Sequence, residues 1–305
     1  AWQSLPLGVL VTQAPEGVPK DLDYRDVAWL YKDYAITTLP SVASLRALRS
    51  FNNKEKEQAT KQPFIGFGNP LLDGDPGNVS LLVWAKSWFR GALADVDEVR
   101  KLARLPDTAD ELRVIAKHLE ADEASLYLEE RATETMVKSV ALDTSRVVAF
   151  ATHGLLSGEL TGFTEPALVL TPPDKGTPED DGLLTASEVA QLKLNADWVI
   201  LSACNTAAAD TPGAEGLSGL AKAFFYAGAR TLLVSHWYVN SYAATRLTTQ
   251  MFDVLEDNPA LGRAEALRQS MMKMASSKEQ SHPIYWGPFV VVGEGGTSPL
   301  YPQLQ

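Results

Sequence analysis

The sequence predicts an α/β protein with a mostly parallel central sheet and helices on both of its faces. Strand-like and helix-like segments alternate along most of the 305 residues, a pattern typical of parallel sheets. Several strand-like segments are continuous apolar runs, as expected for strands covered on both faces. These runs are Phe64–Phe67, Val147–Ala151, Trp198–Leu201, Thr231–Val234 and Phe289–Val292.

Helical patterns fill the intervals between these runs. Thr108–Glu111 and Thr185–Glu188 each have the Thr-x-x-Glu spacing of a capping box, which predicts two helix starts. A further helix is expected over Gly216–Ala227, with Gly228 as its stop. The other expected elements are a strand at Ala124–Leu128, helices at Ala132–Val140 and around Leu247, Met251 and Leu255, and a last helix from Pro259 to Met274.

The chain divides into three parts by this pattern. Residues 60–296 hold the alternating core, and residues 297–305 form a short tail. Residues 1–59 are an N-terminal extension with strand candidates at Leu7–Thr12 and Tyr34–Thr38 and a helix after Leu39-Pro40-Ser41. Pro172–Gly182 is rich in Pro, Asp, Glu and Lys, so it is expected to be a loop.

Composition narrows the classes of partner. The chain has 27 Lys and Arg against 38 Asp and Glu, a net charge of −11, which disfavours nucleic acid and anionic membranes. No apolar run approaches the roughly 20 residues of a membrane span.

The start lacks Met and a secretion signal, so a piece of a longer protein is expected. The single cysteine excludes an internal disulfide and indicates a reduced cytoplasm. The four histidines have no metal-ligand spacing, so neither metal nor cofactor is expected.

Two apolar strands each end in one reactive residue. Val147–Ala151 leads to His153 and Gly154, and Trp198–Leu201 leads to Cys204. If these strands are parallel neighbours, the thiol and the imidazole lie at the same edge of the sheet. A free thiol is mostly protonated at neutral pH. A neighbouring histidine can take its proton and later protonate a leaving amine.

Each residue alone has a simpler interpretation. A lone cysteine at a strand end is usually a small core residue. A lone histidine is more often a hydrogen-bonded structural residue. The catalytic interpretation depends on the two strand ends being adjacent.

A wider set of motifs resembles a known family. The sequence is similar to CHAT domains, which are caspase-like peptidase domains usually fused behind TPR repeats. The motifs are Ala151-Thr-His153-Gly154, Leu201-Ser-Ala-Cys204-Asn-Thr206, Glu215-Gly216-Leu217, Ala227-Gly-Ala-Arg230, Ser235-His-Trp237 and His282-Pro-Ile-Tyr-Trp286-Gly-Pro-Phe289.

The resemblance implies a caspase-like fold and a cysteine endopeptidase that cleaves a protein or peptide substrate. It implies a catalytic dyad of His153 and Cys204, with Gly154 in the oxyanion hole. The chemistry of the site indicates the backbone N–H of Cys204 as a second donor to the oxyanion. The resemblance also implies a bacterial source and TPR repeats upstream. Relatives commonly carry Leu in place of His236 and Asp in place of Asn240, which affects the expected substrate preference but not the dyad.

A further set of residues is expected to line the substrate pocket. In caspase-like folds the residue two before the cysteine and the loop after the first core strand help to line it, which indicates Ser202 with Asp73 or Asp75. An acidic lining would favour Lys or Arg at P1, although both aspartates also fit an ordinary turn. Ser235 and Trp237 are further candidates, and Trp237 also fits a packing role.

Two other functions remain open at this point. One alternative to a peptidase is a non-catalytic interaction module that keeps the fold. The other is a different hydrolase or acyltransferase that uses the same thiol. Labelling by a thiol-reactive peptide separates the first from a peptidase. Assays with ester and amine substrates separate the second.

Overall fold

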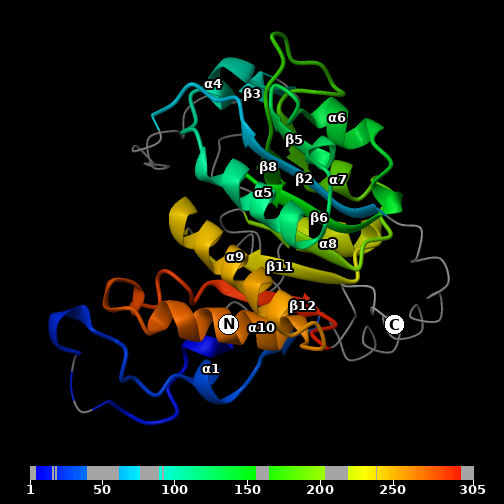
Figure 1. The fold of residues 1–305 in the computed structure, drawn as a ribbon. Coiled ribbons are helices and arrows are strands. Elements are labelled where there is room, and N and C mark those ends of the chain that lie inside the picture. Colours follow the sequence, from blue (N-terminus) through cyan, green and yellow to red (C-terminus); the bar gives the residue numbers. More distant parts are fainter. Residues whose placement is uncertain are drawn as a thin grey trace.

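In the computed structural model of the chain, helices flank one large sheet (Figure 1). The structure describes residues 5–15, 17, 19–39, 62–75, 89–90, 93–155, 165–202, 219–237 and 239–296. The strands are β1 Thr37–Thr38, β2 Gln62–Pro70, β3 Phe89–Arg90, β4 Leu93–Ala94, β5 Leu126–Glu129, β6 Ser145–Ala151, β7 Gly154–Leu155, β8 Ala167–Val169, β9 Leu183–Thr185, β10 Trp198–Leu201, β11 Thr231–Ser235 and β12 Phe289–Gly293. The α-helices are α1 Leu30–Asp33, α4 Val96–Arg100, α5 Asp107–His118, α6 Glu134–Ser139, α7 Ala186–Val189, α8 Gly219–Ala227, α9 Ser241–Asp257 and α10 Arg263–Ala275.

The large sheet has seven strands in the order β1-β12-β11-β10-β6-β2-β5. The strands from β5 to β11 in this order are parallel to one another. β12 is antiparallel to β11, and β1 is parallel to β12. The predicted α/β class with a mostly parallel sheet is therefore confirmed.

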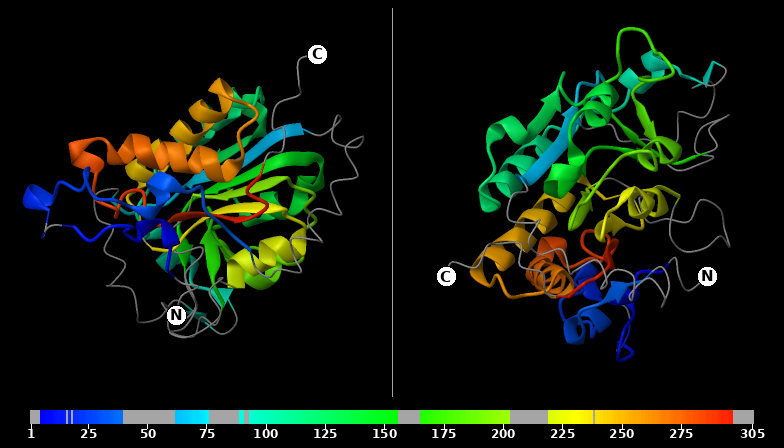
Figure 2. Two further views of the ribbon diagram at one scale, coloured as in Figure 1. Left: turned by 90° about the horizontal axis from the view of Figure 1, so that it is seen from below. Right: turned by 90° about the vertical axis from the view of Figure 1, so that its right-hand side faces the viewer.

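The strand order reverses direction beside β2. The chain moves from β2 outward to β5, and then returns past β2 to β6, β10 and β11. Crossovers between parallel strands are right-handed, so a reversal of direction moves the connecting helices to the other face of the sheet. Figure 2 shows helices on both sides of the sheet from two further directions. Open α/β sheets bind ligands at the carboxyl ends of the strands beside such a reversal.

Two apolar layers follow from the alternation of side chains along each strand. In β6, Val147 and Ala149 pack with α5, α9 and α10, whereas Val148 and Phe150 pack with α6, α7 and α8. Both sets are almost completely buried. This two-sided burial explains why the strand sequences are continuous apolar runs.

Most predicted element positions are confirmed within a few residues, and some are wrong. Thr185 and Glu188 form the predicted capping box, and Gly228 ends α8 with a φ of 114°. The last helix does not begin at Pro259. Residues 258–261 form a turn closed by the Leu261 N–H on the Asn258 carbonyl, and α10 begins after Gly262.

The N-terminal extension contributes to the same sheet. β1 lies within the predicted strand Tyr34–Thr38, and it pairs with β12. The predicted strand Leu7–Thr12 is wrong, because Leu7–Val9 is a 3₁₀ helix and only Val11 forms an isolated bridge, with Trp29. The predicted helix after Pro40 lies outside the described residues. The division at residues 59 and 296 stays a prediction.

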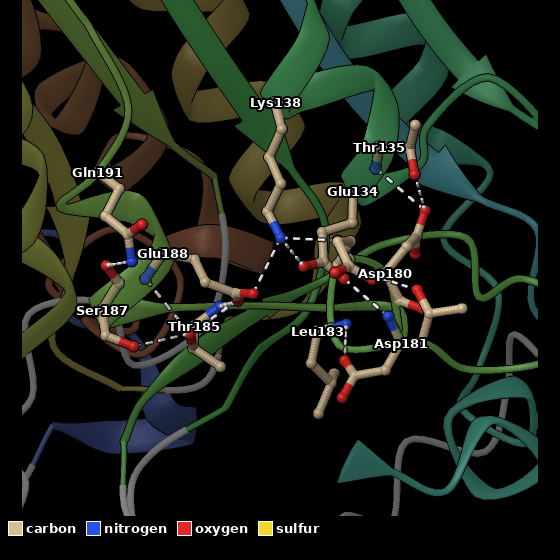
Figure 3. A network of polar contacts seen from close by, with 12 residues as sticks. Glu134, Thr135, Lys138, Asp180, Asp181, Leu183, Thr185, Ser187, Glu188 and Gln191 are labelled. Carbon is tan, nitrogen blue, oxygen red and sulfur yellow. Dashed lines mark hydrogen bonds and ion pairs between the residues drawn. The ribbon is translucent and has the colours of Figure 1, made fainter. Parts of the chain in front are cut away.

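A polar network fastens the predicted loop Pro172–Gly182 to the helices of one face (Figure 3). The Glu134 carboxylate accepts hydrogen bonds from the backbone N–H groups of Asp181 and Gly182, at 3.0 and 3.3 Å. Lys138 pairs with both Glu134 and Glu188. This network lies on α6 and α7, whose apolar neighbours belong to the layer opposite α5.

Among the described residues, no helix is long and apolar enough to cross a membrane.

Candidate active site

The two predicted catalytic strands are parallel neighbours. β6 and β10 pair directly, with Phe150 opposite Leu201. The Ser202 N–H continues the ladder and donates to the Phe150 carbonyl at 2.9 Å. His153 follows Phe150 by the same number of residues as Cys204 follows Leu201. Cys204 itself lies outside the described residues, so the comparison rests on the register of the strands.

His153 is buried at the carboxyl end of β6. Its side chain is 4% exposed, and Nε2 lies 2.7 Å from the carbonyl oxygen of Ala103. A carbonyl only accepts hydrogen bonds, so this contact assigns the proton to Nε2 and leaves Nδ1 as the acceptor nitrogen. Burial lowers the pKa of His153, although the Ala103 hydrogen bond opposes that effect. The ring is therefore neutral at pH 7 and able to accept a proton.

Ala103 is held in place by the loop after β2. Gly74 forms a parallel bridge with Ala103, and its N–H donates to the Leu102 carbonyl at 3.0 Å. The N–H of Asp73 donates to the Arg100 carbonyl at 2.6 Å. This loop therefore supports the histidine through its backbone. The side chains of Asp73 and Asp75 are exposed, as expected of turn residues.

The backbone after His153 is fixed by a small antiparallel sheet. Gly154 begins β7 and pairs with Leu168 of β8. The His153 carbonyl accepts from the Val169 N–H at 2.9 Å, and the Thr152 hydroxyl donates to the Val169 carbonyl. These contacts hold Gly154 beside the histidine. Its role in an oxyanion hole stays a prediction.

A small cavity of about 20 Å³ adjoins His153. The polar residues described in its wall are His153 and five residues with hydroxyl groups, Thr108, Thr152, Ser202, Ser235 and Ser241. Its described apolar walls are Leu105, Val239, Ala244 and Phe289. The structure thus brings Ser202 and Ser235 together with His153. Asp73, Asp75 and Trp237 are not among the described residues of the wall.

Trp237 and His236 contact the segment that precedes β12. Trp237 lies against Gly287, where an added Cβ would be 3.3 Å from its ring. The His236 N–H donates to the Pro288 carbonyl at 3.0 Å. Burial lowers the pKa of the His236 imidazole to about 4. Both residues therefore pack on the segment before β12.

The structure corrects the predicted capping box at Thr108. The Thr108 hydroxyl donates to the Leu105 carbonyl at 2.7 Å and accepts from the Asn69 N–H. Glu111 does not reach the helix start. It shares the buried face of α5 with Leu112 and Ile115 and is itself fully buried. The spacing resembled a cap, but the same spacing places Glu111 on the face that covers the sheet.

Glu111 is a carboxyl group that the sequence interpretation did not connect with this site. Its Oε2 accepts from the Ser202 hydroxyl at 3.0 Å and from the Thr245 hydroxyl at 3.4 Å. Its Oε1 is buried and has no hydrogen-bond partner. Burial raises the pKa of Glu111 to about 7, although its hydroxyl partners oppose that effect. Ser202 therefore joins a buried carboxyl to the wall of the cavity.

Comparison with known families covers nearly the whole chain. The model of the CHAT domain matches residues 2–294. This chain belongs to the CHAT domain family. The predicted resemblance is confirmed, and the predicted caspase-like fold class agrees with the sheet described above.

Two curated relatives match this chain over a small part of their own, much longer chains. Tetratricopeptide repeat protein 28 of Mus musculus is 31% identical over 196 residues, covering 53% of this chain and 8% of the relative. Tetratricopeptide repeat protein 28 of Homo sapiens is 26% identical over 303 residues, covering 87% and 11%. The chain thus spans about a tenth of the length of these relatives. They are mammalian, and the bacterial source stays a prediction.

Solved structures similar to this CHAT domain include cysteine peptidases. A separase–securin complex of Saccharomyces cerevisiae has a TM-score of 0.49 and 16% identity, covering 86% of this chain and 14% of that chain. The Arg-specific cysteine proteinase gingipain R has a TM-score of 0.48 and 13% identity, covering 79% and 48%. At this level of similarity they are no evidence of activity.

Proposed function

We propose that the chain is a cysteine endopeptidase that hydrolyses a peptide bond of a protein substrate. Cys204 is the nucleophile and His153 its acid–base partner. The observation that supports this most is the parallel register of β6 and β10, since both residues follow directly paired positions by equal intervals. The carboxyl ends of parallel strands meet at one edge of a sheet, where α/β proteins carry their reactive groups.

The hydrogen bond from His153 to Ala103 supports a specific division of roles. With its proton on Nε2, the neutral ring accepts the thiol proton at Nδ1. The thiolate attacks the scissile carbonyl, and the N–H groups of Gly154 and Cys204 stabilise the oxyanion. The imidazolium then protonates the leaving amine, and a water molecule hydrolyses the thioester. This sequence needs no cofactor.

A catalytically silent interaction module is the second candidate. The low exposure of His153 and the small volume of the adjoining cavity favour it, because a substrate needs access to both. In this case the domain would act through TPR-linked partners, as the names of its relatives suggest. The upstream TPR repeats and the cytoplasmic location belong to the proposal in either case.

A peptide-library cleavage screen tests the peptidase. The Cys204→Ala variant should fold normally and lose all turnover, and turnover equal to the wild type would refute the proposal. His153→Ala should lower kcat/KM by about 10²- to 10⁴-fold, the usual contribution of a general acid–base group. His118→Ala is the matched control, because His118 is the last residue of α5 and contacts Asp253 and Glu256 of α9.

Thiol labelling separates the two candidates without a known substrate. The chain has one cysteine, so all labelling reports on Cys204. A catalytic thiol should react rapidly with a peptide-linked electrophile, and much more slowly in His153→Ala, since the thiolate is the reactive form. Equal rates in both proteins would favour the silent module.

A further inference from the structure

Most of the hydroxyl groups described in the wall of the small cavity beside His153 donate their hydrogen to other groups of the protein. The Thr108 hydroxyl donates to the Leu105 carbonyl at 2.7 Å. The Thr152 hydroxyl donates to the Val169 carbonyl at 2.5 Å. A hydroxyl group has one hydrogen and two lone pairs. Both groups therefore offer a ligand only acceptor oxygens.

Two more hydroxyls of the wall donate to carboxylate groups. Ser202 Oγ donates to Glu111 Oε2 at 3.0 Å, and Ser241 Oγ donates to Asp107 Oδ2 at 3.0 Å. Hydrogen bonds polarise one another in chains, so a carboxylate behind a hydroxyl makes its oxygen a stronger acceptor. Four of the five hydroxyls among the described wall residues thus have no hydrogen available for a ligand.

The two ionisable groups that accept hydrogen bonds from wall residues of the cavity are both acidic. Glu111 and Asp107 stand behind the wall, and no Lys or Arg is among the described residues that form it. His153 is neutral, and its Nε2–H group donates to the Ala103 carbonyl. Glu111 Oε1 is buried without a hydrogen-bond partner. A buried carboxylate is stabilised by a nearby positive charge, so a cationic ligand at Ser202 would favour the ionised form of Glu111.

We propose that this cavity is the subsite for the ammonium group of a lysine at P1 of the substrate. This inference rests on the proposed peptidase function. The ammonium donates to Ser202 Oγ and Ser241 Oγ, and the carboxylates of Glu111 and Asp107 balance its charge. The apolar walls exclude water, which strengthens these electrostatic contacts.

The size of the cavity selects lysine over arginine. A volume of about 20 Å³ holds roughly one water molecule. An ammonium is a compact point charge, whereas a guanidinium is a wide planar fork with five donors. The ammonium therefore fits in place of one water molecule, with the aliphatic stem of the lysine extending from the cavity towards the catalytic edge.

Matched peptides that differ only at P1 test the subsite. The series carries lysine, arginine, glutamine and norleucine, which keeps an aliphatic stem but has no ammonium. The wild type should cleave the lysine peptide about 10- to 100-fold more efficiently than the norleucine peptide, the range for a hydrogen bond to a charged group. Arginine and glutamine should both fall below lysine.

Substitutions in the wall identify the residues responsible. Glu111→Gln and Ser202→Ala should each reduce the lysine-to-norleucine ratio of kcat/KM by about 10-fold. Glu134→Gln is the matched control, because Glu134 is equally buried but lies on α6, in the layer opposite α5. Circular dichroism checks that each variant folds, and Ser202→Ala decides the test if Glu111→Gln does not fold.

Binding measurements separate failure of the subsite from failure of the peptidase. If the wild type cleaves none of the peptides, the peptidase proposal fails, and calorimetry with Cys204→Ala then compares binding of the lysine and norleucine peptides. Tighter binding of lysine that depends on Glu111 supports the subsite. Equal values for lysine and norleucine, in cleavage or in binding, overturn it, as does an unchanged ratio in Glu111→Gln.

Discussion

Replacing Glu111 with glutamine should remove a pH-dependent cost from the free energy of folding. Glu111 is fully buried, and burial raises its pKa from 4.5 to about 7. Between these two pH values the unfolded chain has lost this proton, whereas the folded chain still holds it. The unfolded state then binds fewer protons, so stability falls as pH rises through this window and becomes constant above it. The difference between the two pKa values corresponds to roughly 3 kcal/mol.

Urea unfolding between pH 5 and pH 8 measures this cost. Other groups also titrate in this range, so the informative quantity is the difference in unfolding free energy between Glu111→Gln and the wild type at each pH. The amide of the variant would keep an acceptor for the Ser202 hydroxyl and cannot ionise. We expect the variant to gain about 2 to 3 kcal/mol relative to the wild type between pH 5 and pH 8.

Parallel pH profiles for the two proteins would refute this reasoning. They would mean that the carboxyl is solvated or paired in the folded protein. Glu123→Gln is the control, because its side chain is 69% exposed and paired with Arg113 rather than with a histidine. Its profile should run parallel to that of the wild type. Unchanged urea m-values are needed for the comparison, since a changed m-value would indicate a change in the unfolded or native state.

Three further predictions concern single residues. Gly228→Ala should destabilise the chain by about 1 to 3 kcal/mol in urea unfolding, because φ is 114° and an added Cβ would lie 2.3 Å from the Leu194 carbonyl oxygen; an unchanged midpoint would contradict that contact. Thr185→Ala should cost about 1 kcal/mol through loss of the capping box with Glu188, and Thr185→Ser should recover most of it. Nitrogen NMR of the His153 ring should show the Nε2–H tautomer at pH 7, persisting below the usual histidine pKa; a doubly protonated ring at pH 7 would exclude the proposed proton transfer.

The strands could be predicted because both of their faces are buried. Val147–Ala151 and Trp198–Leu201 are uninterrupted apolar runs, and each coincides with a strand to within two residues. β1 is different, since its two threonines are exposed and are held by pairing with Val291 and Val292 at the other end of the chain. Local sequence carries little signal for such a distant pairing.

The site was only partly predictable for the same reason. The strand ends at His153 and Ser202 follow from apolar runs, and their adjacency follows from the sheet. Ala103 contributes a backbone carbonyl, which has no side-chain signature. Glu111 is a charged residue, and charged residues are almost never fully buried. Its position depends on Ser202, which is 91 residues away in the sequence.

The titration shifts of Glu111 and His153 have one physical origin. Burial favours the uncharged form of each group, so it raises the pKa of the carboxyl and lowers that of the imidazole. Their effects on stability oppose each other, because the histidine loses stability as pH falls and the carboxyl loses it as pH rises. Near neutral pH the imidazole is uncharged and the carboxyl is about half ionised. A lysine ammonium beside Ser202 would favour the ionised carboxylate, so substrate binding and ionisation of Glu111 are coupled in the proposed subsite.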